Sequence, residues 1–303
     1  MYHSISEPHP EADLWGLEVR PRRFEQQIEA LARTRDIISL AELGSDVRQG
    51  RLRPNTLAIT FDDGYANNVS IAGPILRQWN APATLFVCTG FIGRRAFWWD
   101  QLVDTIVTAT RSPRCLPGEG LAAAETILRM RPRDRTPRTL HALTLAIWQA
   151  LQPRALTSID ASLAELEDLF RPVGRRDDRR PMRASEVGAA PAYFAVGAHS
   201  VTHPPLSTLD DTQLAAEIQD SRHQCETLTG QRIRTFAYPF GDCDARVSGC
   251  VSQYMDLACA TAEAPVGAHT GPYDIPRIRV GDWRPGQLIA KMGRVSRAAN
   301  RSS

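Results

Sequence analysis

The chain has 303 residues, of which 43% are hydrophobic, and its formal net charge is +2. This length suits one large domain or two small ones, and the near-neutral charge gives no reason to expect nucleic acid or anionic lipid as a partner. The first twenty residues contain acids, prolines and histidines, unlike a signal peptide, and no apolar run is long enough to span a membrane. The six cysteines form no C-x-x-C pair, which favours reduced thiols. We therefore expect a cytoplasmic protein without an integral membrane segment, although a truncated start could hide export.

Short apolar runs alternate with helix-like stretches, a pattern typical of an α/β fold with buried parallel strands. The spacing of apolar residues predicts helices over residues 23–31 and 214–230, and Ser39 with Glu42 forms a capping box that opens another helix. The predicted strands are LAITF (57–61), ATLFVCTG (83–90), YFAVGA (193–198), TFAYPF (235–240) and RIRV (277–280).

Residues from about 95 to 185 interrupt this alternation. The segment opens with AFWWDQLVDTIV and closes with RPVGRRDDRRPMR, which predicts a mostly helical insertion ending in an exposed, arginine-rich loop. A charge run of this kind is usually a solvated surface. We therefore expect a single domain over residues 1–303 that carries this insertion.

Two adjacent carboxylates, Asp62 and Asp63, end the first apolar strand, LAITF. At the carboxyl end of a barrel strand they would face the mouth where such folds keep their sites. Neighbouring strand residues point to opposite sides, so the two acids are expected to take different roles unless the turn at Gly64 rotates one of them. Taken alone, Asp-Asp-Gly also suits a helix cap.

Two histidines, His199 and His203, follow the strand at 193–198 and lie four residues apart. A helical turn or tight loop of that length brings two imidazoles to one side, a common spacing for metal ligands. Two surface histidines near a turn remain the alternative. The later segment FAYPFGD (236–242) can present backbone N–H groups into a site or be a plain exit from a strand into a loop. For PRIRVGDW (276–283), the ordinary interpretation is an edge strand with an aromatic plug.

The order of these segments resembles the polysaccharide deacetylase family, which has a NodB-homology domain and is also called carbohydrate esterase family 4. The matching segments are TFDDG (60–64), HSVTH (199–203), YPFG (238–241) and an arginine-containing strand that ends in Asp-Trp (277–283). The opening MYHSIS also resembles the start of that family. An FWWD entry to the insertion is similar to that of members linked to surface polysaccharides.

The resemblance implies a distorted (β/α)7 barrel, similar to a TIM barrel, that holds a divalent metal, usually zinc, and hydrolyses an acetamide on a sugar. Carried over by motif, Asp63, His199 and His203 are the metal ligands, a set of donors that suits zinc. Asp62 matches the general base, which takes a proton as water attacks. The metal lowers the pKa of that water and polarises the acetyl carbonyl.

The same resemblance assigns three further residues around the acetyl group. Phe240 would donate its backbone N–H to the oxyanion. Asp282 and Trp283 resemble the fourth motif, in which Trp283 forms a wall of the acetyl pocket.

The chain departs from the family pattern in two places. The family often has an arginine that orients the base where this chain has Ala237, and we expect Arg277 to replace it, with Arg279 as the alternative on the same side of the strand. No histidine follows Asp282, so the general acid is missing from its usual place. Tyr2-His3 fits a permuted variant with that histidine at the N-terminus, and His3 is our predicted acid. The alternative is that residues 1–5 are a frayed end.

The sequence thus predicts a metal-dependent enzyme that removes the N-acetyl group from an N-acetylated carbohydrate, within surface-polysaccharide metabolism. An O-acetyl carbohydrate esterase is the nearest alternative, because the same site can cleave either bond. An inactive carbohydrate-binding homologue would lack a ligand or the base, and this chain has all of them. A purely structural domain would leave the order of the four motifs as coincidence.

Overall fold

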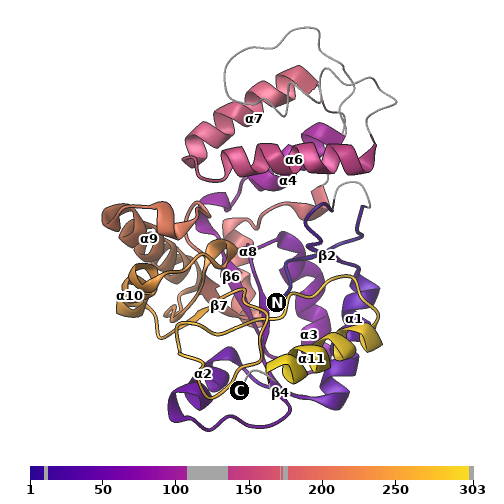
Figure 1. Cartoon of the computed structure of the whole chain (residues 1–303), viewed down its shortest axis with the longest axis vertical. Helices are drawn as coiled ribbons and strands as arrows, with labels where there is room; N and C mark the ends of the chain where they lie inside the picture. The colour runs from indigo at the N-terminus through magenta and orange to yellow at the C-terminus, as the bar shows by residue number, and fades with distance from the viewer. Residues whose placement is uncertain (10–12, 108–135, 171, 173–176, 300–303) are drawn as a thin grey trace. The chain divides into compact units, whose positions relative to one another are not determined.

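The computed structural model describes residues 1–9, 13–107, 136–170, 172 and 177–299 (Figure 1). They form two compact units, which are described separately: residues 1–7, 16–94 and 181 onward make the first, and residues 8–15 and 95–180 make the second. The larger segment of the second unit nearly coincides with the predicted insertion, and a single domain over residues 1–303 stays a prediction. In the described part of the chain, no helix is both long and apolar enough to cross a membrane, and the five cysteines are free thiols.

A curled parallel sheet of five strands, in the order β5-β6-β7-β8-β9, forms the centre of the first unit. Two parallel pairs, β1 with β2 and β3 with β4, accompany it. The strands are β1 (Ser4–Ile5), β2 (Glu18–Val19), β3 (Asp36–Ile37), β4 (Thr56–Leu57), β5 (Ile59–Phe61), β6 (Ala83–Val87), β7 (Ala195–Ala198), β8 (Thr235–Ala237) and β9 (Leu257–Cys259).

Contacts beyond the regular ladders close this sheet into a ring. Tyr2 bridges Phe61 of β5, and Ile275 bridges Cys259 of β9. The backbone N–H of Val280 donates to the carbonyl of Met1 at 3.0 Å, which joins the two outer segments. The first unit is therefore a distorted (β/α) barrel, as the sequence predicted.

Helices follow most of the barrel strands, as expected when parallel strands are joined by crossovers. The longer helices of the first unit are α1 (Pro21–Thr34), α2 (Leu40–Gln49), α3 (Gly73–Gln78), α8 (Ala184–Ala189), α9 (Asp211–Thr229), α10 (Ala245–Tyr254) and α11 (Pro285–Ala299). The predicted capping box of Ser39 and Glu42 is present at the start of α2. Gly230 ends α9 in the left-handed conformation, also as predicted.

Four of the five predicted strands are present, but each is shorter than its apolar run. The prediction of a strand over residues 277–280 is wrong, because these residues belong to no ladder. Their backbone groups instead bond to separate partners: the N–H of Arg277 donates to Ala262 and that of Val280 to Met1. Without strand alternation, Arg277 is buried whereas Arg279 is exposed, so the two do not share one face as we expected.

The N-terminal segment is packed into the barrel and is not a frayed end. The ring of Tyr2 stacks on Phe61 with centroids 5.4 Å apart and meets Phe24 of α1 edge-on at 5.1 Å. The Tyr2 hydroxyl donates to Oε1 of Gln27 at 3.1 Å, and Ile5 is fully buried. These contacts hold the residue between them, His3, at a fixed place.

The second unit is mostly helical in its described residues, with α4 (Trp98–Val107), α6 (Pro137–Leu151) and α7 (Leu156–Phe170). Helix α4 packs against both α6 and α7. The expected exposed, arginine-rich loop is partly wrong: Arg179 is buried and bonds to Asp100 at 3.2 Å and to Asp104 at 2.6 Å. A buried guanidinium requires such carboxylate partners. Residues 171 and 173–176 of this loop lie outside the described residues.

Candidate metal centre

The two carboxylates that follow β5 turn to different partners. Both Asp62 and Asp63 are buried. Asp63 has φ = 72° and Gly64 has φ = 92°, so the backbone turns sharply immediately after the strand. The N–H of Cys88, after β6, donates to the Asp63 carbonyl at 3.0 Å and holds this turn. Asp62 consequently faces Arg277, whereas Asp63 faces the two histidines.

Asp63, His199 and His203 form a compact cluster of possible ligands. Their donor atoms all lie within 4.8 Å of one another, and all three side chains are buried. The Asp63 Oδ1 atom is 3.5 Å from Nε2 of each histidine, and the two Nε2 atoms are 3.2 Å apart. In the part of the chain that the structure describes, no other group of histidine, cysteine and acidic residues has this arrangement.

A backbone carbonyl fixes the orientation of the His199 ring. The Nδ1 atom lies 2.7 Å from the carbonyl oxygen of Ala237. Because a carbonyl only accepts, Nδ1 must carry a proton, which leaves Nε2 as the ring nitrogen that faces Asp63 and can ligate a metal. This is the usual outer support of a metal-binding histidine. It needs only the backbone of Ala237, so the missing family arginine does not affect it.

The electrostatics of the cluster fit a cation. Burial, together with the neighbouring His199, lowers the pKa of His203 to about 3, which keeps this imidazole neutral and able to ligate near pH 7. Burial alone would raise the pKa of Asp63, but hydrogen bonding to His199 and the charges of the histidines outweigh it, so the pKa lies below its ordinary value. Burial alone would lower the pKa of His199, but the hydrogen bond to Asp63 and the charges of both aspartates outweigh it and raise the pKa, so a cation would bind in place of the proton on Nε2. One carboxylate and two imidazoles form a donor set that fits a divalent metal such as zinc.

Arg277 donates two parallel hydrogen bonds to the carboxylate of Asp62. Nη1 lies 2.6 Å from Oδ1, and Nη2 lies 2.8 Å from Oδ2. A third donor, Nε, bonds to the carbonyl of Ala260 at 2.8 Å and fixes the guanidinium plane. Burial alone would raise the pKa of Asp62, but the charge of Arg277 outweighs it, with smaller contributions from His199 and His3. The Asp62 carboxylate is therefore held charged and oriented.

His3 lies close enough to both aspartates for their charges to affect it. Burial lowers the pKa of His3, while the charges of Asp63 and Asp62 oppose this shift. The carbonyl of His3 accepts a bond of 2.6 Å from Nδ2 of Asn68, and Asn67 accepts from the N–H of Ile5 at 3.0 Å. Two asparagines thus fix the N-terminal segment that carries His3, a support that the sequence reasoning missed.

Phe240 lies beside the cluster on a strained turn. Its φ is 57°, and its ring meets that of His203 edge-on with centroids 4.4 Å apart. Gly241 follows with φ = 72°, and a Cβ at that position would collide with the Thr261 side chain. The Phe240 side chain thus contacts one histidine of the cluster, and the role of its backbone N–H as an oxyanion donor stays a prediction.

Asp282 and Trp283 both accept hydrogen bonds from α1 or from the residue before it. The N–H of Arg20 donates to Oδ1 of Asp282 at 3.1 Å, and the Arg20 guanidinium lies 3.3 Å from Oδ2. The carbonyl of Trp283 accepts a bond of 2.8 Å from Gln27. The indole is half-buried against the core. The assignment of Trp283 to an acetyl pocket stays a prediction.

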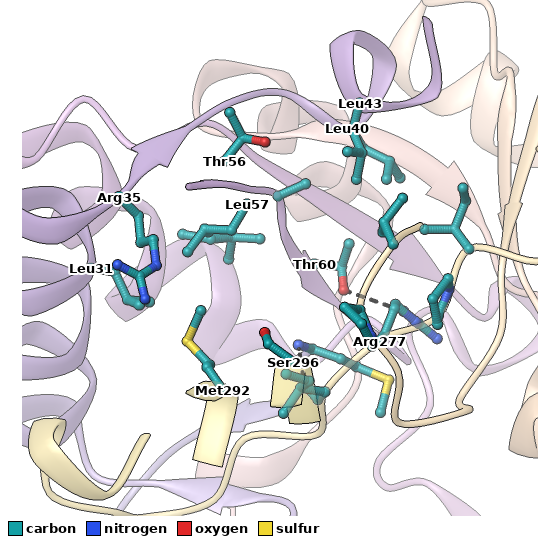
Figure 2. Close-up of a pocket in the computed structure, with 18 of the residues that line it drawn as sticks. Leu31, Arg35, Leu40, Leu43, Thr56, Leu57, Thr60, Arg277, Met292 and Ser296 are labelled. Atoms are coloured by element: carbon teal, nitrogen blue, oxygen red, sulfur yellow. Dashed lines mark hydrogen bonds between the residues drawn. The ribbon is translucent and has the colours of Figure 1, made fainter. Parts of the chain in front are cut away.

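A cavity of about 530 Å³ lies in the first unit among α1, α2, β4, α11 and the start of β5 (Figure 2). Its walls are mainly aliphatic, with side chains such as Leu31, Leu43, Leu57 and Met292. Arg277 and Thr60 lie at one end and are joined by a hydrogen bond of 3.3 Å (Figure 2). None of the three candidate metal ligands is among the described residues that line this cavity. The candidate metal site therefore lies outside the cavity.

A carboxylate that the sequence reasoning did not single out, Glu217 of α9, accepts hydrogen bonds from the loop between the two histidines. Nothing in the local pattern marks this residue, because it lies on an ordinary helix fifteen residues or more from its partners.

Most of the chain matches a known protein family. Residues 49–153 and 165–255 match the model of the polysaccharide deacetylase family. No curated protein sequence matches the chain.

Three solved structures illustrate the similarity of fold. The Streptococcus pyogenes deacetylase PplD in complex with acetate has 18% identity and a TM-score of 0.62, over 96% of both chains. IcaB from Ammonifex degensii has 15% identity and a TM-score of 0.59, over 96% of this chain and 94% of that one. A de-N-acetylase from Aggregatibacter actinomycetemcomitans has 12% identity and a TM-score of 0.56, over 96% and 97%.

Proposed function

We propose that this chain, which belongs to the polysaccharide deacetylase family, is a metal-dependent hydrolase that removes the N-acetyl group from an N-acetylated sugar or polysaccharide. Family membership makes it a carbohydrate deacetylase, and the metal, the bond cleaved and the residue roles are our proposal. One structural neighbour is named a de-N-acetylase, which is consistent with this choice of bond.

The proposal rests mainly on one observation: the adjacent carboxylates Asp62 and Asp63 have different partners. Asp63 points into a buried cluster with two imidazoles, whereas Asp62 is bound on both oxygens by Arg277. A helix cap, the alternative interpretation of Asp-Asp-Gly, would leave these carboxylates at a helix N-terminus. The observed arrangement instead supports one carboxylate as a metal ligand and a separate, charged carboxylate as the base.

In the proposed reaction, each residue of the site has a separate role. Asp63, His199 and His203 would hold the divalent cation, which when bound polarises the acetyl carbonyl and lowers the pKa of water. Asp62 accepts the proton of the attacking water, and Arg277 keeps this base charged and oriented. The backbone N–H of Phe240 donates to the carbonyl oxygen as negative charge develops on it. His3 donates a proton to the leaving nitrogen, because an amine otherwise departs as a poor anion.

Acetate release from matched substrates tests this proposal against the esterase alternative. The purified protein, supplied with Zn²⁺, is incubated with an N-acetylated hexosamine oligomer and with the same oligomer carrying only O-acetyl groups. We expect acetate and free amines from the first substrate. Release confined to the O-acetylated oligomer would identify an esterase. No release from either, by a protein that binds metal, would favour the inactive homologue. The Asp62→Asn variant is the control for contaminating activity.

A further inference from the structure

We infer that Glu217 of α9 is a positioning residue that sets the affinity of the metal centre by holding the loop between His199 and His203. The inference rests on the proposed function, because it concerns the metal that those histidines would bind. Glu217 lies beside this loop because α9 packs against β7, the strand that leads into His199.

Both carboxylate oxygens of Glu217 are committed to two consecutive loop residues. Oε2 accepts from the backbone N–H of Val201 at 2.7 Å and from that of Thr202 at 2.9 Å. Oε1 accepts from the Thr202 hydroxyl at 2.6 Å. Hydrogen bonds to a charged acceptor are stronger than neutral ones, and three of them converge here on one partly buried side chain.

The loop needs such support because its backbone is strained. Ser200 has φ = 63° and His203 has φ = 60°, in the left-handed region that residues other than glycine rarely adopt. Strained residues persist only where their surroundings over-determine them. Within the loop, one bond helps: the N–H of His203 donates to the Ser200 hydroxyl at 3.0 Å.

The opposite side of the loop is held by the segment after β6. The N–H groups of Thr89 and Gly90 donate to the carbonyls of Ser200 and Val201 at 3.2 and 2.8 Å. A Cβ on Gly90 would lie 2.5 Å from the Val201 carbonyl oxygen, so this approach requires glycine. The loop is therefore fixed by its carbonyls on one side and by its N–H groups, through Glu217, on the other.

The contacts from Glu217 and from the segment after β6 together fix the loop, and the loop sets the distance between the Nε2 atoms of His199 and His203. Residues 201 and 202 connect the two ligands, and the Nε2 atoms must converge to share one ion. Without Glu217, the N–H groups of Val201 and Thr202 lose their acceptor. The segment that joins the two left-handed residues, Ser200 and His203, then loses part of the support that holds their strained backbone in place. Metal binding would then have to order the loop, and the entropy lost in doing so lowers the affinity of the site for the metal.

Zn²⁺ affinity of the full chain, measured by competition with a chromophoric chelator, tests the inference. We expect Glu217→Ala to bind Zn²⁺ on the order of 10–100-fold more weakly, as is typical when a group supporting a metal ligand is removed. Glu217→Gln keeps an acceptor oxygen but loses the charge, so it should bind Zn²⁺ more tightly than the alanine variant and more weakly than wild type. Thr202→Val, combined with Glu217→Ala, should add no further loss, because both changes remove the same contact.

A control on the same helix separates positioning from general stability. Glu226 accepts from the N–H of Ile233 at 3.0 Å and from Arg222 at 3.1 Å, and none of these partners belongs to the histidine loop. Glu226→Ala should lower the melting temperature and leave Zn²⁺ affinity unchanged. Hydrogen exchange in the metal-free protein should show faster exchange of the Val201 and Thr202 amides in Glu217→Ala only.

Wild-type affinity in Glu217→Ala, or an equal loss in Glu226→Ala, overturns the inference and leaves the proposed function intact. If the alanine variant does not fold, wild-type affinity in both Glu217→Gln and Thr202→Val overturns it as well. A wild-type protein that binds no Zn²⁺ overturns the proposed metal centre and this inference with it.

Discussion

Four residues other than glycine have positive φ angles around the candidate site: Asp63, Ser200, His203 and Phe240. Such strain gathers where a site must present groups in directions that regular structure does not allow. The sequence identified three of these residues as functional from their chemical type and order. It could not predict the strain itself, because serine and phenylalanine rarely adopt that conformation, and the enrichment of aspartate and histidine in it does not single out one position. The direction of each side chain therefore had to come from the structure.

The separate roles of the two carboxylates lead to a first prediction. Asp62→Asn should keep its metal, because Asp62 contacts Arg277 and is outside the ligand cluster. The same variant should lose turnover by roughly 10²–10⁴-fold, since an amide no longer accepts the proton. Metal content and acetate release measured on one preparation check both halves. Near wild-type turnover of Asp62→Asn, together with an inactive Asp63→Asn that retains its metal, would show that the roles are reversed.

A second prediction concerns the pH dependence that Arg277 imposes. The charge of Arg277 holds the pKa of Asp62 below its ordinary value against the opposing effect of burial. Removing that charge in Arg277→Ala must raise the pKa, so the base becomes protonated at higher pH. We therefore expect the acid limb of the kcat/KM profile to move to higher pH and kcat to fall, with most of the metal retained.

The exposed neighbour Arg279 provides the matched control for this profile. Arg279→Ala should leave the acid limb where it is in wild type, because this side chain is exposed and Arg277 makes the bonds to Asp62. A profile that shifts in Arg279→Ala and not in Arg277→Ala would contradict the assignment.

Strands and helices were predictable to different degrees. The helices α1, α2 and α9 carry their own signals in apolar spacing and caps. Helices α1 and α9 begin and end close to the predicted places, and α2 begins at the predicted capping box. The segment 277–280 did not become a strand, because its hydrogen bonds go to Met1 and Ala262, which are distant in sequence. No local pattern encodes such partners. The same reason explains why Arg277 alone, and not Arg279 beside it, is buried.

The docking of the N-terminal segment leads to a third prediction. Because Tyr2 and Ile5 are buried and Asn68 holds the His3 carbonyl, the imidazole of His3 is fixed near the aspartates. His3→Ala should keep its metal and lose roughly 10²-fold or more in amide hydrolysis. It should lose less on an activated acetyl ester, whose leaving group needs no proton.

His223→Ala is the control for the third prediction, since His223 is exposed on α9 and should behave as wild type. Equal rates of wild type and His3→Ala on the amide would place the acid elsewhere. The first alternative to examine would then be the exposed His269.

The barrel brings together residues from the whole length of the first unit. The site combines segments near residues 3, 62, 199, 240 and 277. The segments near residues 62, 199 and 240 follow β5, β7 and β8, whose carboxyl ends meet at one edge; those near residues 3 and 277 reach the site through contacts outside the sheet. The order of motifs was enough to predict this meeting and the family. The pairing of Arg277 with Asp62 followed only as one of two options, and Glu217 was not found at all. Both depend on which strands and helices become neighbours after closure.

Metal content of the two histidine variants tests the central claim most directly. His199→Ala and His203→Ala each remove one imidazole of the three-residue cluster. With the wild-type protein as reference, elemental analysis should find about one divalent ion per wild-type chain and a marked loss in both variants. Circular dichroism should show that their fold is intact. Full retention of the metal in both correctly folded variants would contradict the account.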